Sequence, residues 1–298
     1  MKVAILSATD IYANNGGVES YLKNYIAFRR KQGDDVTVIS TEGKVKSKLD
    51  LFLKTFTFAF KKHDLREYDE VYTNTHSFQL FIKSSKTVSI WHGSGLQRFL
   101  EDWRAFFSPY TYLDAFLEVL DLMFSPTIYA VSRHTSNFIH KDDNETVMYP
   151  IAADCFVQLR NEKIQDGYKR ILFVGDPKNK RKGFAVMLKA LELLPENFKL
   201  IVCGGNNVEI AAHKNHQIEY MGTIENNKMP KFYSMCDCYC LPTTYEGTPL
   251  TVIEAIACKC HVVATKVGGI PEIVKEKDGY IARYDAKDIA NGIMTVTK

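Results

Sequence analysis

Short apolar runs alternate with segments of helical periodicity along the whole chain, and this alternation constrains the fold more than any other feature of the sequence. Residues 3–7 form the first apolar run, and after a polar, glycine-containing turn the apolar residues recur at helical spacing. A strand followed by a helix pairs in parallel with the next strand, because the helix carries the chain back to the end at which the first strand began. The sequence therefore predicts an α/β protein with parallel sheets. The later strands expected in the first half span residues 36–40, 70–73, 87–91, 127–131 and 146–148.

The second half of the chain repeats this scheme. Its expected strands span residues 170–174, 199–203, 218–221, 238–241 and 261–264, and its expected helices lie near residues 183–194, 207–214, 226–235, 249–258 and 270–275. The 298 residues are enough for two α/β domains of about 150 residues each. A polar stretch at residues 160–167 separates the two series of elements. We therefore predict one Rossmann-like domain over residues 1–158 and a second over residues 159–298.

Composition narrows the class of protein. Apolar residues make up 46% of the chain and charged residues 24%, so a sizeable core is expected and bulk disorder is not. The net charge of +3 is too small to indicate a nucleic-acid partner. No signal peptide opens the sequence and charged residues interrupt every long apolar stretch, so we expect a cytoplasmic protein without a spanning segment. The seven cysteines include no Cys-x-x-Cys pair, and we interpret them as reduced thiols in a core rather than as a zinc site.

Residues 51–62 allow two interpretations. They combine four phenylalanines with lysines inside and at the end of the segment. We favour an amphipathic helix that packs on the first domain, because most apolar stretches of soluble proteins belong to a core. The alternative is a peripheral membrane contact through residues 51–62, since bulky aromatic side chains flanked by lysines suit a lipid interface.

The most informative segment is the turn and helix at residues 242–255. A buried strand is expected to end near Leu241, and a polar turn then leads into a helix with Pro249 in its first turn, where a missing N–H costs nothing. Thr248 is expected to cap this helix. The free amides after Gly247 would point out of the helix start, beside the positive end of its dipole. The segment therefore predicts an anion site.

Two carboxylates flank this predicted anion site. Glu246 precedes it, and Glu254 stands about one helical turn inside it. A carboxylate so near a phosphate is repelled unless it accepts hydrogen bonds, and the hydroxyl groups of a sugar and of a ribose can donate them. Either glutamate alone would be interpreted as an exposed charge. Together with the turn, the pair predicts a ligand that carries both phosphate and sugar.

These motifs resemble a known family. Glu246 and Glu254, with seven residues between them, and the later run Gly268-Gly269-Ile270-Pro271-Glu272 resemble the carboxyl-terminal signature of the family-4 retaining glycosyltransferases of GT-B fold. Residues 170–175 leading to Lys182-Gly183, the run Gly16-Gly17-Val18-Glu19 and residues 149–154 resemble other segments of the family. The resemblance is strongest over residues 170–275. It implies two Rossmann-like domains that face each other across a cleft, with the acceptor on the first domain and the nucleotide-sugar donor on the second.

The resemblance also implies roles for individual residues. Glu254 would bind the ribose hydroxyls of the donor, and Glu246 would lie against the transferred sugar as a catalytic residue. Lys182 resembles the phosphate-binding lysine of the family. The remaining donor-binding groups would be Gly16 and Gly17 in the first domain and the backbone of Gly247, Thr248, Pro249 and Leu250 in the second.

One position departs from the family pattern. Asp176 stands where the family usually has an arginine, soon after the glycine that opens the second domain. A diphosphate leaving group needs cations around it, so another side chain is expected to take over. We expect Arg181 in this role, ahead of Lys178 and Lys180.

A histidine follows one strand of the first half. His92 and Gly93 come directly after residues 87–91, and ligands of open α/β sheets bind at the carboxyl ends of the strands. The family often has an active-site histidine in such a position, in contact with the donor sugar. We favour this catalytic role for His92 over that of a packed or surface histidine.

The resemblance implies a glycosyltransferase that moves a hexosyl or related group from a nucleotide-diphosphate sugar to a glycan, a lipid-linked acceptor or another hydroxyl acceptor, with retention of anomeric configuration. The nucleotide-sugar is a co-substrate, and no cofactor is expected. The sequence has no Asp-x-Asp motif, so we expect no metal site and a metal-independent reaction. Two alternatives stay open. The first is a non-catalytic accessory or binding protein on the same scaffold, and the second is a nicotinamide-dependent dehydrogenase, which the missing Gly-x-Gly-x-x-Gly spacing disfavours.

Overall fold

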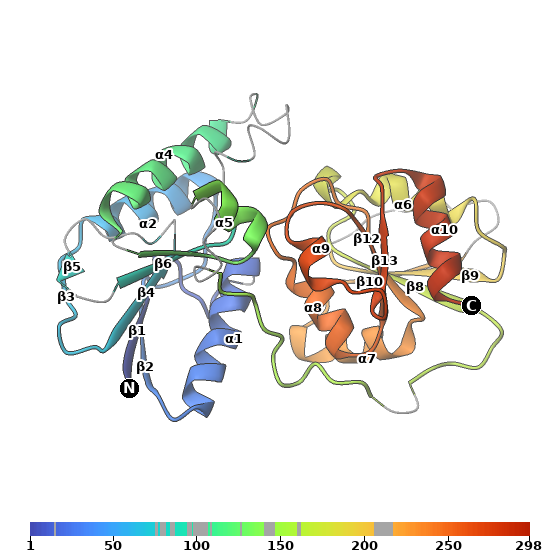
Figure 1. Ribbon diagram of the computed structural model, residues 1–298, viewed down its shortest axis with the longest axis horizontal. Helices are drawn as coiled ribbons and strands as arrows, with labels where there is room; N and C mark the ends of the chain where they lie inside the picture. The colour runs from blue at the N-terminus through green and yellow to red at the C-terminus, as the bar shows by residue number, and fades with distance from the viewer. Residues whose placement is uncertain are drawn as a thin grey trace. The chain divides into compact units, whose positions relative to one another are not determined.

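The computed structural model describes residues 1–14, 16–74, 77, 82–83, 87–93, 97, 107, 109–125, 127–139, 147–159, 162–205 and 217–298. Its contacts divide the chain into two units, Met1–Ile151 and Ala152–Lys298, each with its own sheet and helices (Figure 1). Every strand pairing in both large sheets is parallel. The prediction of an α/β protein with two Rossmann-like halves is therefore confirmed.

The first unit is built on a five-stranded sheet of order β2-β1-β4-β6-β7. Its strands are β1 (Lys2–Ser7), β2 (Asp35–Ser40), β4 (Glu70–Asn74), β6 (Thr87–Trp91) and β7 (Thr127–Ala130). The chain first adds β2 on one side of β1 and then adds β4, β6 and β7 on the other, which is a doubly wound order. Val3, Ala4, Ile5 and Leu6 are fully buried, as expected for a central strand that is covered on both faces. Of the predicted strand at 146–148, Val147 forms a bridge to Ala130, and residue 146 lies outside the described residues.

Helices cover both faces of this sheet. They are α1 (Gly17–Lys31), α2 (Lys48–Ala59), α4 (Pro109–Phe124) and α5 (Arg133–Ile139), and two short strands, β3 (His63–Asp64) and β5 (Ile82–Lys83), pair with each other. Phe58 of α2 packs with Ala4, Leu6 and Val71 on one face of the sheet. Within the described ranges, every helix is too short or too polar to cross a membrane.

The second unit is built on a six-stranded sheet of order β10-β9-β8-β11-β12-β13. The strands are β8 (Lys169–Val174), β9 (Phe198–Cys203), β10 (Gln217–Gly222), β11 (Cys238–Leu241), β12 (His261–Thr265) and β13 (Gly279–Ala282). The helices are α6 (Phe184–Leu191), α7 (Met229–Met235), α8 (Leu250–Ala257), α9 (Ile270–Ile273) and α10 (Ala286–Val296), with 3-10 turns at η4 (Lys180–Lys182) and η5 (Asn226–Lys228). This strand order is that of the dinucleotide-binding Rossmann sheet, with the direction of winding reversed between β8 and β11. The predicted helix at 207–214 lies outside the described residues.

The cysteines of the second unit are core residues. Six of the seven thiols are buried and Cys155 is exposed. Cys238 and Cys240 point into one layer of the core, whereas Cys203, Cys236, Cys258 and Cys260 lie in the other. They pack as small apolar side chains on both faces of the sheet.

The contacts place the boundary between the units at residues 151 and 152, before the predicted boundary at 158 and 159. Phe156 accounts for this difference, because its buried ring packs against Tyr233 in the core of the second unit. Ala152 and Ala153 pack against the same core. The segment that precedes β8 therefore belongs to the second unit by its packing.

Candidate active site

The candidate site lies at the carboxyl ends of β8 and β11. These two strands pair through Ile171 with Cys238 and through Leu172 with Tyr239, although more than sixty residues separate them in the chain. The chain winds outward in opposite directions from this pair, and the loops that leave such a point diverge and leave room for a ligand. The loop after β8 carries Asp176, Arg181 and Lys182, and the loop after β11 carries Glu246.

Hydrogen bonds and a close backbone contact join the two loops. Thr244 N donates to Arg181 O at 3.0 Å, and Thr243 Oγ1 donates to the same oxygen at 3.0 Å. Gly183 ends η4 in the left-handed region with φ +72°, and a Cβ built on it would lie 1.7 Å from Pro242 O. Only glycine permits this approach. The contact holds the cations of the first loop beside the acid of the second.

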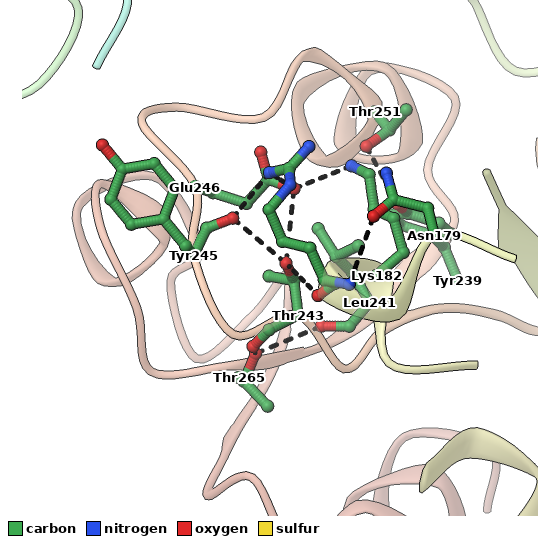
Figure 2. Close-up of polar contacts among 10 residues, drawn as sticks. Asn179, Lys182, Tyr239, Leu241, Thr243, Tyr245, Glu246, Thr251 and Thr265 are labelled. Atoms are coloured by element: carbon green, nitrogen blue, oxygen red, sulfur yellow. Dashed lines mark hydrogen bonds and ion pairs between the residues drawn. The ribbon is translucent and has the colours of Figure 1, made fainter. Parts of the chain in front are cut away.

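Glu246 forms ion pairs with two of the three cationic residues of η4, Arg181 and Lys182 (Figure 2). Its Oε1 lies 2.7 Å from Lys182 Nζ and 2.9 Å from Arg181 Nη1. Arg181 Nη1 also donates to Tyr245 O at 2.6 Å. Burial raises the pKa of Glu246, but the attraction of Lys182 and Arg181 outweighs it and the pKa lies below its usual value. The cluster of one carboxylate and two cations therefore has a net charge of +1 and attracts an anion.

Asp176 does not join this cluster of charges. Its carboxylate accepts a hydrogen bond from Lys178 N at 2.9 Å, so it stabilises its own turn. An added Cβ on Gly205 would lie 2.9 Å from Asp176 Oδ1, which places the carboxylate beside the loop that follows β9. Of the three cations considered as replacements for the family arginine, Arg181 lies against Glu246, whereas Lys178 and Lys180 are exposed.

The helix after the second loop starts one residue later than the sequence predicts. Pro249, not Thr248, is the residue that precedes the first helical position of α8, and its backbone is extended with φ −73° and ψ 119°. Proline has no side chain that could cap the first amides, so these amides are left to other acceptors. The helix start at Leu250 adjoins the Glu246 loop, and together they present a positive helix end beside two cations.

Two glycines support the loop from the side of β12. Gly269 N donates to Gly247 O at 2.6 Å. Gly268 is in the left-handed region with φ +53°, and a Cβ on it would lie 1.7 Å from Glu246 O. The Gly-Gly run that contributes to the family resemblance thus has a physical role, because its backbone packs directly on the backbone of the predicted catalytic residue.

Glu254 is buried inside α8. Tyr233 OH donates to its Oε2 at 3.0 Å. Burial raises the pKa of Glu254 to about 7, and the hydrogen bond from Tyr233 opposes this rise only in part. Tyr233 was not identified from the sequence, and no local pattern indicates it, since it lies on α7. Near neutral pH the carboxyl group is divided between its protonated and ionised forms.

This pKa predicts a pH-dependent stability. Between 4.5, the value for the unfolded chain, and about 7, the native protein holds a proton that the unfolded chain has released, so the free energy of unfolding falls as pH rises through this window. Glutamine cannot ionise, so the wild type is expected to lose about 2 kcal/mol relative to Glu254→Gln between about pH 5 and pH 8. Urea unfolding at several pH values measures this difference. Glu225→Gln, on an exposed side chain, is the control and should follow the wild type, and parallel curves for wild type and Glu254→Gln would contradict the prediction.

In the first unit, the structure brings together the glycine-rich turn and the histidine. Gly16 and Gly17 are exposed at the start of α1, after β1, and His92 follows β6. The ring of Tyr21 in α1 meets the ring of His92 edge to face, with centroids 4.6 Å apart. The three predicted residues therefore lie at the carboxyl edge of one sheet.

No cluster of three or more His, Cys, Asp or Glu side chains with metal-binding geometry occurs among the residues that the structure describes. The ion cluster at the carboxyl ends of β8 and β11 instead consists of two cations, Arg181 and Lys182, and one carboxylate, Glu246. These side chains suit an anionic ligand rather than a cation.

Comparison with solved structures identifies the fold of the whole chain as GT-B. The sucrose-phosphate synthase of Thermosynechococcus elongatus aligns with a TM-score of 0.75 and 17% identity, over 99% of this chain and 89% of that one. HepE of Anabaena in complex with UDP-glucose aligns with a TM-score of 0.66 and 16% identity, over the same shares of the two chains. The predicted GT-B fold is confirmed.

The sequence of the second unit matches a known family. Residues 157–298 match the family described as glycosyl transferases group 1. The α-maltose-1-phosphate synthase of Mycolicibacterium smegmatis is 27% identical over 132 residues, which are 40% of this chain and 34% of that protein. The chain thus spans about a third of the length of this and two other curated relatives that it matches.

Proposed function

We propose that the protein transfers a glycosyl group from a nucleotide-diphosphate sugar to a hydroxyl acceptor, with retention of anomeric configuration. The observation that carries this proposal is the arrangement of Arg181, Lys182 and Glu246 beside the start of α8, at the point where the winding of the second sheet reverses. Two cations, a positive helix end and nearby carboxylates fit a ligand with phosphates at one end and hydroxyl groups at the other.

Each group of the site has a part in this reaction. Lys182 and Arg181 bind the diphosphate, and the amides at the start of α8 add partial positive charge. Glu254 accepts hydrogen bonds from the ribose hydroxyls. Glu246, whose lowered pKa keeps it ionised, accepts from hydroxyls of the transferred sugar. The catalytic role of His92, which follows β6 in the first unit, stays a prediction.

The bond changes are those of a front-face substitution. The bond between the anomeric carbon and the diphosphate oxygen breaks, and the acceptor oxygen bonds to the same face of that carbon. The acceptor proton passes to the departing phosphate oxygen, so no enzyme nucleophile is required. The negative charge on the leaving group grows as the bond breaks, and preorganised cations stabilise it more in the transition state than in the ground state.

The solved HepE complex contains UDP-glucose. This complex makes uridine-diphosphate sugars the first donors to test. For the acceptor we propose a glycan, a lipid-linked compound or another hydroxyl compound.

Asp176 supports a second candidate function. An acidic residue in the usual arginine slot leaves the diphosphate with one cation fewer, and this favours a non-catalytic protein that binds a sugar ligand on the same scaffold.

A thermal-shift screen over nucleotide-sugars, followed by an assay for sugar transfer and donor hydrolysis, tests both candidates. A donor at about a hundredfold its Kd adds about 2.7 kcal/mol to the free energy of unfolding, which raises the melting temperature measurably. Glu254→Gln, which replaces a carboxylate acceptor of the ribose hydroxyls with a neutral and weaker amide acceptor, should reduce the shift by the cognate donor. Binding together with turnover supports the transferase, whereas binding with neither transfer nor hydrolysis supports the second candidate. If none of the nucleotide-sugars raises the melting temperature, both candidate functions are contradicted.

Transfer is expected to continue in excess EDTA. Lys182, Arg181 and the start of α8 neutralise the diphosphate in this proposal, so no divalent cation is needed. Initial rates with EDTA and with added Mg²⁺ or Mn²⁺ measure the effect. Complete loss of activity in EDTA that is restored by Mn²⁺ would contradict the proposed mechanism.

A further inference from the structure

Helix α2 exposes a stripe of apolar side chains. Leu49, Leu53 and Phe56 of α2 and Phe60, its C-cap residue, follow one another at intervals of four, three and four residues, which places them on one side of the helix. Their exposed fractions lie between 48 and 66%. The opposite side of α2 is filled by buried Thr55, Phe58 and Ala59. Both sides of the helix are therefore apolar, whereas a surface helix of a soluble domain usually has a polar outer side.

Helix α4 repeats the pattern. Tyr112, Phe116, Val119 and Met123 have the same spacing, and their exposed fractions lie between 43 and 69%. The acidic residues Glu118 and Asp121, which would make an outer side polar, are buried. The polarity of α4 is thus reversed, with carboxylates inside and apolar side chains outside.

Hydrogen bonds to Asp121 fix this orientation of α4. Its Oδ2 accepts from Ser89 Oγ at 2.6 Å and from Trp91 Nε1 at 2.6 Å, both on β6, and Oδ1 accepts from Ser125 Oγ. A rotation of α4 that turned the apolar stripe inward would break these buried hydrogen bonds, which is costly. Tyr112 lies nine residues before Asp121, about two and a half turns of an α-helix, and so points to the opposite side.

The two stripes lie on neighbouring helices. Ala59 of α2 packs against Leu117 of α4. Phe58 contacts Val71 on β4, and the register pairs Val71 with Thr87 and Thr73 with Ser89, so α2 and α4 cover the same face of the sheet. Figure 1 shows the two helices together on that side of the first unit. We call the eight exposed residues of the two stripes the α2–α4 surface.

Lysines lie at both ends of the α2 stripe. Lys44 and Lys46 are exposed just before α2, and Lys61 and Lys62 are exposed just after it. Apolar side chains between lysines match a membrane surface. The apolar side chains can insert among the acyl chains, and the lysines can pair with anionic headgroups. A symmetric contact with a second copy would bring the same lysines towards each other, and like charges oppose such a contact.

We propose that the α2–α4 surface docks on lipid bilayers that contain anionic headgroups, with α2 and α4 lying in the interface. The aromatic and aliphatic side chains of the surface enter the boundary between headgroups and acyl chains, and the four lysines contact the headgroups. This proposal does not depend on glycosyl transfer, because docking involves only the first unit and needs no donor.

The test is co-sedimentation of the full chain with vesicles of phosphatidylcholine alone and of phosphatidylcholine with phosphatidylglycerol. Binding is expected on the anionic vesicles and is expected to weaken as salt is added. Phe56→Glu combined with Phe116→Glu should lower the partition coefficient at least about tenfold. Lys61→Gln combined with Lys62→Gln should lower it about tenfold on anionic vesicles.

The matched control is Leu193→Glu combined with Met294→Glu, which replaces two exposed apolar side chains of the second unit and should leave binding unchanged. Circular dichroism melting of each variant checks that it is folded. Failure of the wild type to bind anionic vesicles, or equal binding by Phe56→Glu/Phe116→Glu, would overturn the proposal. A concentration-dependent dimer in sedimentation velocity that this double variant abolishes, without vesicle binding by the wild type, would assign the surface to a second copy instead.

Discussion

Replacing Lys182 with alanine is expected to lower kcat/KM for the nucleotide-sugar donor about a hundredfold, and replacing Arg181 is expected to have a comparable effect. In the proposed reaction both side chains stabilise the charge that develops on the departing diphosphate. Both already lie within 3 Å of the same carboxylate oxygen, so they are held in place before the ligand binds. Each single variant leaves Glu246 with one cation, and the protein should stay folded.

Lys180→Ala is the matched control for this prediction. Lys180 belongs to the same 3-10 turn, η4, and its side chain is exposed. Steady-state kinetics of the three variants are expected to show a small change for Lys180→Ala and large losses for the other two. If Arg181→Ala behaves like Lys180→Ala, Arg181 is not the replacement for the missing family arginine. In that case the presence of Asp176 in the arginine position would favour the non-catalytic binding protein.

Gly268→Ala is expected to lower the free energy of unfolding of the second unit by about 3 kcal/mol or more. It is also expected to weaken donor binding. The added Cβ would lie 1.7 Å from Glu246 O in a backbone conformation of φ +53°. Relief of this overlap must displace the Glu246–Gly247 backbone, because the clash involves main-chain atoms rather than the end of a flexible side chain. Urea unfolding and a thermal-shift titration with the cognate donor measure the two effects.

Gly222→Ala separates the clash from the backbone strain. Gly222 has a similar φ of +66°, but no atom lies within 4 Å of the position that its Cβ would occupy. This variant is expected to lose only about 1 kcal/mol, the cost of a left-handed conformation for a residue with a side chain. An equal decrease in the free energy of unfolding of the two variants would show that the close contact between Gly268 and Glu246 adds nothing to the cost of the left-handed conformation.

The sequence was most informative where an apolar run ends at a turn. The predicted bounds of β6 and β11 agree with the structure, because a buried parallel strand is a nearly continuous apolar run and polar residues or glycine follow it. The elements β13 and α10 were not predicted. β13 has only four residues and begins with Gly279, and Gly292 interrupts the helical pattern of α10. Asp285, whose side chain accepts hydrogen bonds from Lys287 N and Asp288 N, is the capping signal that would have indicated α10.

The ion cluster of the site was harder to predict. Glu246, Arg181 and Lys182 were each identified, but the sequence separation of 64 residues between Lys182 and Glu246 conceals that they form a pair. Their contact depends on the pairing of β8 with β11, which is a property of strand order and not of local sequence. The orientation of α4 was concealed for a similar reason, because the buried acceptor Asp121 is satisfied by a distant strand. The roles of the site residues, the absence of a cofactor and the cytoplasmic location stay predictions.

The raised pKa of Glu254 has a consequence for how donors are measured. A ribose hydroxyl that donates to Glu254 favours its ionised form, so a bound donor would expel the proton that part of the population carries near pH 7. Binding would then release protons to the buffer, and the observed binding enthalpy would include the heat of buffer protonation. Affinity would weaken as pH falls below about 7, because more of the free protein would have to lose that proton first. Calorimetric titrations in two buffers of different ionisation enthalpy would count the protons released with each donor bound.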